Sequence, residues 1–195
     1  MELISLTSKN FQDAIGIAAK ILKNGGVVMA PTDTVYGLLA DATNEAAIKK
    51  IYGAKKRSLE KPLPIFVKNM AMAKKLAAIN LRQQKILDEI WPGKFTAVLK
   101  RKNGIKIFGV ARDTVGLRIP FYPFINSLLE TFNQPLAGTS ANISGQATST
   151  KIDDILRQFA SEKILPDIVL NAGDLPESKP SAIVDLMAQE IKIIR

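Results

Sequence analysis

The chain contains neither cysteine nor histidine in its 195 residues. These absences exclude disulfide bonds, zinc sites built from Cys and His, thiol nucleophiles and imidazole bases. Any catalysis must use hydroxyl, amide, carboxylate, lysine or arginine groups, backbone N–H groups, or a metal ion on oxygen ligands. No apolar run approaches the roughly 18 residues of a membrane-spanning helix, and the first residues lack the pattern of a signal peptide. We therefore expect a cytoplasmic protein that does not act at a membrane.

The composition fits a single domain, residues 1–195. Hydrophobic residues make up 47% of the chain, which is enough for a substantial core. The net charge is +9, and no long block of like charges occurs. Such a balance is typical of proteins that bind nucleotides, polyphosphates or RNA, but it also arises where lysines only provide solubility. Charge alone leaves both interpretations open.

Helical and strand patterns alternate along the chain. Apolar spacing predicts helices over residues 8–23, 45–55, 70–78, 81–90, 123–132 and 152–159, with Asn44 and Asn80 as caps. Short apolar runs predict strands over 27–30, 36–40, 63–67, 96–100, 115–119, 135–139, 168–170, 181–186 and 191–194. This alternation favours one α/β domain with a sheet covered by helices.

A first group of polar side chains follows the predicted strand 27–30 and ends at Tyr36. Thr32, Asp33 and Thr34 supply two hydroxyls and a carboxylate there. The carboxyl ends of strands are where ligands usually bind in α/β sheets. The same residue types also favour turns, and Asp33 can bond the neighbouring backbone. The segment is therefore either a ligand site or a turn.

A second group places four cations within seven residues, at the end of a predicted helix and just before a strand. They are Lys55, Lys56, Arg57 and Lys61. Cations at a helix C-terminus are stabilised by the helix dipole, which would be a purely structural reason for them. The alternative is a polyphosphate clamp, because Arg offers a planar fork and Lys a compact charge for phosphate oxygens.

A third group of small polar residues, 138–145, follows a predicted strand and begins and ends with glycine. It contains Ser140 and Asn142. Such a loop lets backbone N–H groups approach an anion closely, but an ordinary polar turn has the same composition. The spacing is neither that of a Walker A loop nor that of a dinucleotide-binding Gly-x-Gly-x-x-Gly turn.

Two isolated cations complete the candidates. Arg118 lies inside an apolar strand, where a buried charge is costly unless it is paired, so it is either a structural ion-pair partner or an anion ligand. Arg195 ends the sequence, where a solvated terminus is the alternative to a ligand role.

Together these segments resemble the YrdC-like family of threonylcarbamoyl-AMP synthases over nearly the whole chain. Six short motifs in the family's order and spacing carry the resemblance. They are Pro31–Leu38, Lys55-x-Arg57 with Pro62-Leu63, Trp91-Pro92-Gly93 with Thr96, Gly116–Pro120, Ser140–Gly145 and Pro180–Asp185. Each motif is weak alone, and the set is specific.

The resemblance implies an α/β fold with a twisted mixed sheet of parallel and antiparallel strands, flanked by helices, and a large basic cavity. It implies a single-domain nucleotidyltransferase that forms threonylcarbamoyl-AMP and pyrophosphate from L-threonine, bicarbonate or CO₂, and ATP. This adenylate would supply a separate t6A transferase complex that modifies tRNA. Mg²⁺ would be carried by the ATP phosphates rather than by direct protein ligands.

The resemblance also implies the roles of individual residues. The catalytic residues would be Lys55, Arg57, Ser140 and Asn142. ATP would be bound by Lys55, Arg57, Lys61, Thr114, Ser140, Asn142, Thr148 and Arg195. Threonine would be bound by Thr32, Tyr36, Arg118 and Ser181. Two positions depart from the family: Phe66 stands where many relatives carry His, and Lys61 where Asn is common.

Two further interpretations are compatible with the charge or the resemblance. One is a basic module that binds double-stranded RNA or tRNA without catalysis, and weak tRNA binding could also accompany the enzyme activity. Few aromatic stacking motifs occur, which argues against sequence-specific recognition of single strands. The other is a hydrogenase-maturation carbamoyltransferase, which also contains a YrdC-like domain. Those proteins are long and carry cysteine-rich zinc segments, and neither feature is present here.

Overall fold

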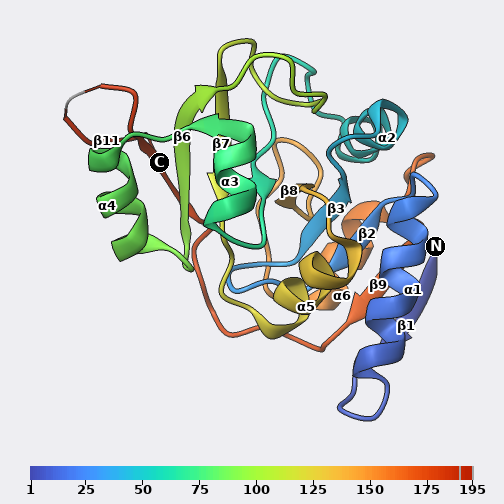
Figure 1. The fold of residues 1–195 in the computed structure, drawn as a ribbon. Helices are drawn as coiled ribbons and strands as arrows, with labels where there is room; N and C mark the ends of the chain where they lie inside the picture. The colour runs from blue at the N-terminus through green and yellow to red at the C-terminus, as the bar shows by residue number, and fades with distance from the viewer. Residues whose placement is uncertain (189, 195) are drawn as a thin grey trace.

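The computed structural model describes residues 1–188 and 190–194, which form a mixed sheet with helices packed on it (Figure 1). The helices are α1 (Phe11–Lys23), α2 (Glu45–Lys55), α3 (Met70–Leu76), α4 (Leu81–Ile90), α5 (Pro123–Phe132) and α6 (Ile152–Phe159). The strands are β1 (Glu2–Ser5), β2 (Val28–Ala30), β3 (Gly37–Asp41), β4 (Ile65–Phe66), β5 (Ala77–Ala78), β6 (Phe95–Arg101), β7 (Thr114–Arg118), β8 (Leu136–Ser140), β9 (Ile168–Asn171), β10 (Ala182–Asp185) and β11 (Lys192–Ile193).

Parallel and antiparallel pairs both occur in this sheet. The strands lie in the order β1-β9-β2-β3-β8-β4-β7-β6-β10-β11, and β5 pairs with β6 beside this path. Strand β9 is parallel to β1 and β2, β4 is parallel to β7, and β6 is parallel to β10. The remaining pairs are antiparallel. The predicted fold class, an α/β protein with a mixed sheet flanked by helices, is confirmed.

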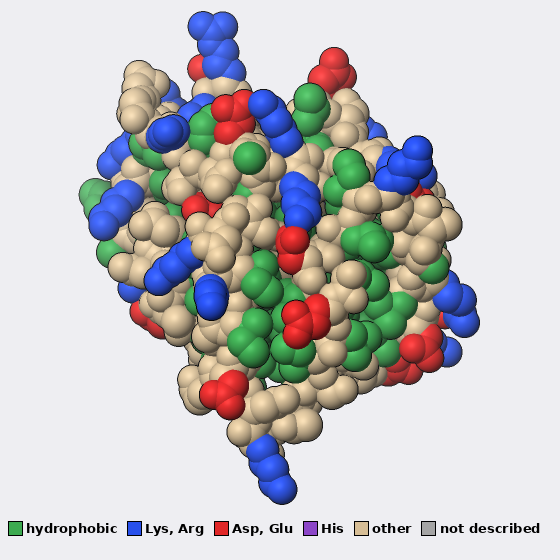
Figure 2. Space-filling model, turned by 90° about the vertical axis from the view of Figure 1, so that its right-hand side faces the viewer, with side chains coloured by type: hydrophobic (Ala, Val, Ile, Leu, Met, Phe, Trp, Pro, Cys, Tyr) green, Lys and Arg blue, Asp and Glu red, His purple; other side chains and the backbone are tan. Residues whose placement is uncertain are grey.

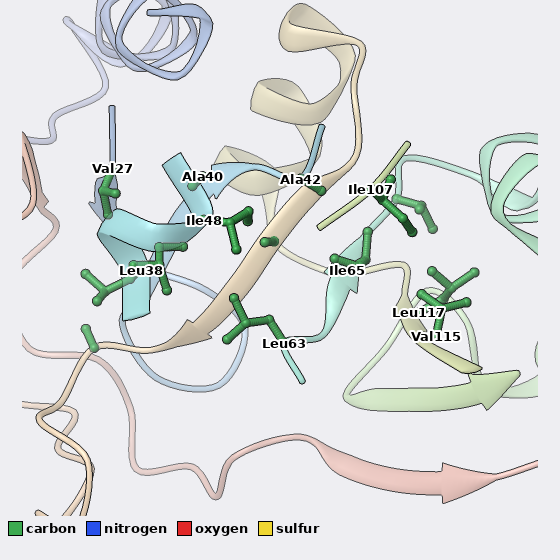
Figure 3. Close-up of a cluster of buried hydrophobic side chains, with 14 of the residues drawn as sticks. Val27, Leu38, Ala40, Ala42, Ile48, Leu63, Ile65, Ile107, Val115 and Leu117 are labelled. Atoms are coloured by element: carbon green, nitrogen blue, oxygen red, sulfur yellow. The ribbon is translucent and has the colours of Figure 1, made fainter. Parts of the chain in front are cut away.

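Side chains of the central strands alternate between two apolar clusters. In β2, Val28 packs in one cluster and Met29 in the other, as the period of two in a strand requires. The cluster around Val28 includes apolar residues of α1 and α5. The cluster around Met29 includes residues of α2 and α6, and Figure 3 shows part of it, with Ile48 of α2 beside Leu38 and Ala40 of β3. The central strands of the sheet are therefore buried on both faces.

The helix predictions are accurate except at the start of the first helix, which begins at Phe11 rather than at residue 8, and at the end of the third. Helices over residues 81–90, 123–132 and 152–159 are confirmed at both ends. Asn44 and Asn80 cap their helices, with side chains that accept hydrogen bonds from Ala47 N and Gln83 N. The predicted helix 70–78 is wrong in its last residues, because Ala77 and Ala78 pair with β6 as a short strand. Strand β1 was not predicted, since its largely exposed residues show no alternation.

The register of the sheet brings distant sequence motifs together. Gly37 of β3 lies opposite Ser140 of β8, so the loops after β2 and β8 meet. Phe66 of β4 lies opposite Arg118 of β7. Two motifs that flank these strands, at residues 31–36 and 140–145, therefore lie near one another. None of the helices in the described residues is long and apolar enough to cross a membrane.

Candidate active site

A cavity of about 130 Å³ lies where these motifs meet. Six of the predicted site residues line it: Thr32, Tyr36, Arg57, Arg118, Ser140 and Ser181. Drug-sized ligand pockets hold roughly 300–1,000 Å³, so this cavity suits one small polar molecule rather than a whole nucleotide. Two guanidinium groups border it, while the large basic cavity implied by the family resemblance stays a prediction.

Lys55 lies beside the cavity but points into the protein. Its side chain is buried, and its Nζ donates to Ser140 O at 2.7 Å, to Asn142 O at 2.8 Å and to Asn142 Oδ1 at 2.8 Å. Burial lowers the pKa of Lys55 to about 7, and the nearby charge of Arg57 adds to this shift. The three acceptors around Nζ favour the charged form and so oppose this lowering of the pKa, because a neutral amine could donate only two hydrogen bonds. The geometry is therefore that of an ammonium whose three donors are all in use.

The loop that follows β8 is organised by Asn142. Its Oδ1 accepts from Lys55 and from Ser140 Oγ at 2.7 Å, and its Nδ2 donates to Ile143 O and Gln146 O. The backbone N–H groups of residues 141–144 are also bonded within the protein. The interpretation of this loop as a backbone cradle for an anion is therefore wrong for these four groups. What the loop presents to the cavity is Ser140.

Arg57 borders the cavity and lies two residues after Lys55, beyond a turn at Lys56. Helix α2 ends at Lys55, and Lys56 adopts a left-handed conformation with φ of 50°. Lys56 then points to solvent and pairs with Glu162, whereas Arg57 turns back towards the cavity. The Nε of Arg57 donates to Lys61 O and its Nη2 to Pro62 O, which fix the guanidinium against the chain. The turn at Lys56 thus directs the Lys56 side chain to solvent and the Arg57 side chain to the cavity.

Arg118 forms a buried ion pair with Asp33. Their side chains are 3% and 7% exposed, and Arg118 Nη2 lies 2.7 Å from Asp33 Oδ1. Burial lowers the pKa of Arg118, while the facing carboxylate raises it. The guanidinium also lies 5.6 Å from the centre of the Phe66 ring. Gly138 has no room for a side chain, because a Cβ there would lie 2.9 Å from that ring.

The hydroxyl groups at the cavity are already engaged in the fold. Thr32 Oγ1 donates to Val35 O at 2.7 Å and accepts from Thr34 N at 3.1 Å. Ser181 Oγ lies 3.2 Å from Thr96 Oγ1. These bonds support the turn interpretation of residues 32–35, and a ligand role for Thr32 or Ser181 would have to share or replace them.

Tyr36 lines the cavity, but its hydroxyl binds the segment after β9. The hydroxyl donates to Gly173 O at 2.6 Å and accepts from Ala172 N at 2.9 Å. Burial raises the pKa of Tyr36 to about 12, so the hydroxyl keeps its proton at neutral pH. A threonine-binding role for this hydroxyl stays a prediction, and the bonds themselves serve the fold.

Tyr36→Phe should lower the free energy of unfolding by about 1 kcal/mol and leave threonine affinity unchanged. The reason is that both bonds of the hydroxyl go to backbone groups, and water can replace it at the exposed residues Ala172 and Gly173. Urea denaturation and calorimetry with threonine check the two halves. A loss of threonine affinity with unchanged stability would assign the hydroxyl to the ligand instead.

Besides Lys55 and Asn142, three described residues predicted to bind ATP do not line this cavity: Lys61, Thr114 and Thr148. The side chain of Lys61 is exposed, and its carbonyl accepts bonds from Tyr52 and Arg57. Thr114 borders a separate, largely apolar cavity of about 270 Å³, and Thr148 borders another of about 540 Å³. Arg195 lies outside the described residues. We call the cavity of about 130 Å³ the central cavity. The cavity that Thr114 borders shares Pro62, Pro64 and Ile183 with it, and the cavity that Thr148 borders shares Val35.

Sequence reasoning missed the partner of Arg118. Asp33 stood in a recognised motif, but the local turn interpretation assigned it to neighbouring backbone. The structure pairs it instead with a residue 85 positions away. The signal that was present is the need of a buried cation for an anion, which singled out Arg118 without naming the carboxylate.

Comparisons with known proteins agree with this geometry. The family model for Sua5, YciO and YrdC, described as "Telomere recombination", matches residues 20–195. The chain belongs to the Sua5/YciO/YrdC family. In this chain, residues from five of the six motifs line one cavity, and Gly93 O of the sixth accepts a hydrogen bond from Arg118 Nε.

Three relatives illustrate how far the likeness extends. A Methanocaldococcus jannaschii protein, provisionally named a threonylcarbamoyl-AMP synthase, is 36% identical over all of this chain and 91% of its own length. The threonylcarbamoyl-AMP synthase of Pyrococcus abyssi is 33% identical over 88% of this chain, which spans 50% of that protein. The crystal structure of P. abyssi Sua5 with L-threonine superposes on all of this chain and 56% of its own, with a TM-score of 0.85 and 29% identity.

Proposed function

We propose that this member of the Sua5/YciO/YrdC family is an L-threonylcarbamoyladenylate synthase, a nucleotidyltransferase that consumes L-threonine, bicarbonate or CO₂, and ATP. One observation carries the proposal. A cavity sized for a small molecule is bordered by a buried, oriented Arg118 together with Arg57 and Ser140. The chemistry supports an amino acid carboxylate bound beside a triphosphate. The comparisons support the same activity and do not favour an RNA-binding module without catalysis.

The reaction needs no imidazole or thiol. The free amine of threonine adds to CO₂ and loses a proton, which gives a carbamate. A carbamate oxygen then attacks the α-phosphorus of ATP, an O–P bond forms, and pyrophosphate leaves. Because the carbamate is already an anion, the protein's task is to hold two anions together and to stabilise charge on the triphosphate. The available Lys, Arg and hydroxyl groups suit that task.

The geometry divides the predicted catalytic residues into two kinds. Arg57 and Ser140 line the cavity, which supports a direct contact of each with substrate. The three donors of Lys55 and all four hydrogen-bonding positions of the Asn142 amide are used inside the protein. We assign Lys55 and Asn142 to positioning Ser140, with the buried charge of Lys55 adding a positive potential behind the loop.

ATP is too large for the central cavity and would extend into its neighbours. The cavity that Thr114 borders is mostly apolar, which suits a base, and the one beside Thr148 is more polar. Both share wall residues with the central cavity. We therefore keep Thr114, Thr148 and Lys61 as ATP-binding residues, and Thr32 and Ser181 with Arg118 as threonine-binding residues, while Tyr36 would contribute the wall of the threonine cavity rather than its hydroxyl.

Mg²⁺ is proposed to enter with ATP. Among the described residues, Asp33 is the only carboxylate that is hydrogen-bonded to Arg118. Both of its oxygens already accept hydrogen bonds, from Arg118 Nη2 and from Phe121 N, so it is a poor candidate for a Mg²⁺ ligand. Phosphate oxygens and water would therefore supply most of the ligands, which is the usual arrangement for Mg²⁺ with nucleotides. The ion would neutralise phosphate charge.

Removal of divalent cations with EDTA should abolish adenylate formation and leave threonine affinity unchanged. The reason is that the metal is assigned to the triphosphate rather than to the amino acid cavity. Product formation and calorimetric threonine titration, each with EDTA and with excess Mg²⁺, check this. Threonine binding that disappears with EDTA would place the metal in the amino acid cavity.

The downstream partners are inferred from the chemical identity of the product, and no docking surface on this chain enters the inference. We propose that the adenylate passes to a t6A transferase complex and that tRNA affinity of this chain is weak. Lys and Arg side chains on the face in Figure 2 are dispersed among Asp and Glu rather than gathered into one continuous area. We propose the cytoplasm as the location, where tRNA and ATP are available.

The deciding experiment is mass spectrometry of the product after incubation with ATP, threonine and bicarbonate. The expected result is threonylcarbamoyl-AMP together with one equivalent of pyrophosphate. Carbamoyl phosphate in place of threonine and bicarbonate is the control, since a carbamoyltransferase would use it. Absence of the adenylate from a folded, ATP-binding preparation would reject the proposal.

A further inference from the structure

The carboxylate of Asp33 bridges two segments at the edge of the cavity. One oxygen accepts from Arg118 Nη2 at 2.7 Å, and the other accepts from Phe121 N at 3.1 Å. Asp33 itself sits in the loop after β2, while Arg118 ends β7 and Phe121 follows it. The carboxylate therefore holds the end of β7 and the loop after β2 in a fixed relation.

Three contacts orient the guanidinium of Arg118. Asp33 holds Nη2, Gly93 O accepts from Nε at 2.9 Å, and the Phe66 ring lies 5.6 Å away. Within the described residues, no hydrogen bond reaches the remaining nitrogen, Nη1. Arg118 borders the cavity, and its buried side chain leaves no other route to a ligand. Nη1 is thus the group available to a carboxylate that enters the cavity.

We propose that Asp33 is the positioning residue that aims Arg118 Nη1 at the substrate carboxylate, and so governs the affinity for the amino acid. This inference rests on the proposed function. Asp33 has two opposing effects on a bound carboxylate. Its negative charge weakens the attraction of Arg118, whereas its bond to Nη2 fixes the direction of the guanidinium. The proposal says that the second effect is the larger.

The sign of the change in Asp33→Asn separates these effects. Asn keeps the size of the side chain and an acceptor for one bond, but it removes the charge that anchors Nη2. If orientation dominates, threonine binds about tenfold more weakly. If charge dominates, threonine binds more tightly. Turnover at saturating threonine and the KM for ATP should stay within about twofold, because the residue acts on amino acid binding alone.

The experiment measures threonine affinity by calorimetry without ATP, and then threonine KM and kcat. A double-mutant cycle with Arg118→Gln tests the route, because Asp33→Asn should have no further effect once Arg118 is gone. The matched control is Asp167→Asn, since Asp167 also pairs with a cation, Lys50, and accepts a backbone bond from Val27 N, but lies away from the cavity. Asp33→Ser provides a second variant if Asp33→Asn melts early.

The outcomes distinguish this inference from the proposed function. Weaker threonine binding in Asp33→Asn or Asp33→Ser, coupled to Arg118 and absent in Asp167→Asn, supports it. Unchanged or tighter threonine binding in Asp33→Asn, or an effect that persists in the Arg118→Gln background, overturns the inference. The proposed function stands in that case as long as the wild-type protein makes the adenylate. A folded wild-type protein that binds no threonine overturns both.

Discussion

Arg57→Ala should lower the rate of adenylate formation by about three orders of magnitude while the fold stays intact. Arg57 borders the cavity and is held by Lys61 O and Pro62 O, so its guanidinium is pre-oriented towards the place where phosphates would lie. Arginines that stabilise a phosphoryl-transfer transition state typically contribute about 10³-fold or more. Its half-buried side chain is not part of either apolar cluster, so its loss should cost little stability.

Pyrophosphate release measures the rate, and thermal melting measures the fold. Lys56→Ala is the matched control, because it removes the same charge from the adjacent residue, whose ammonium points to solvent and pairs with Glu162. Lys55→Ala gives a useful contrast. Its loss should reduce the rate as well, but it should also loosen the loop after β8, because Ser140 O and both Asn142 oxygens each lose the hydrogen bond from the Lys55 ammonium. A pyrophosphate rate in Arg57→Ala equal to that of Lys56→Ala would remove Arg57 from catalysis.

Local signals were sufficient for most of the fold. Helix α4 combines an apolar face with a capping asparagine, α5 an apolar face with an N-terminal proline, and α6 an apolar face with two aspartates in its first turn, so their bounds could be predicted from local features. Strand order could not, because the pairing of β8 between β3 and β4 depends on contacts between segments about 70–100 residues apart. Strand β1 and the pairing of Ala77 with β6 are likewise set by neighbours in space and carry no pattern of their own.

The site shows the same division. Arg118 could be singled out from the sequence because a cation in an apolar strand needs an anion. Its partner could not be named, since the turn at residues 32–35 explains Asp33 equally well until the sheet brings Arg118 beside it. The cationic group at 55–57 is similar: the sequence shows three adjacent charges, and only the left-handed turn at Lys56 decides that each one points in a different direction. Such directions depend on backbone angles that composition does not encode.

Replacement of Arg118 should weaken threonine binding at least about 100-fold, because the amino acid carboxylate would lose its charged partner in a buried site. The single change Arg118→Ala would leave the Asp33 carboxylate buried without a cation, which costs about 3–5 kcal/mol and could unfold the chain. The double variant Asp33→Asn with Arg118→Gln avoids this, since it leaves two neutral amides of similar size that can still bond to each other.

Calorimetric titration with threonine checks the double variant, and titration with ATP provides the internal control. ATP affinity should stay within a few-fold, because Arg57 and the loop after β8 do not depend on the ion pair. A threonine amide sharpens the test. Because the amide lacks the carboxylate, the wild-type protein and the double variant should bind it with similar, low affinity. Threonine affinity that survives in the folded double variant would show that Arg118 serves the fold and that the carboxylate is bound elsewhere in the cavity.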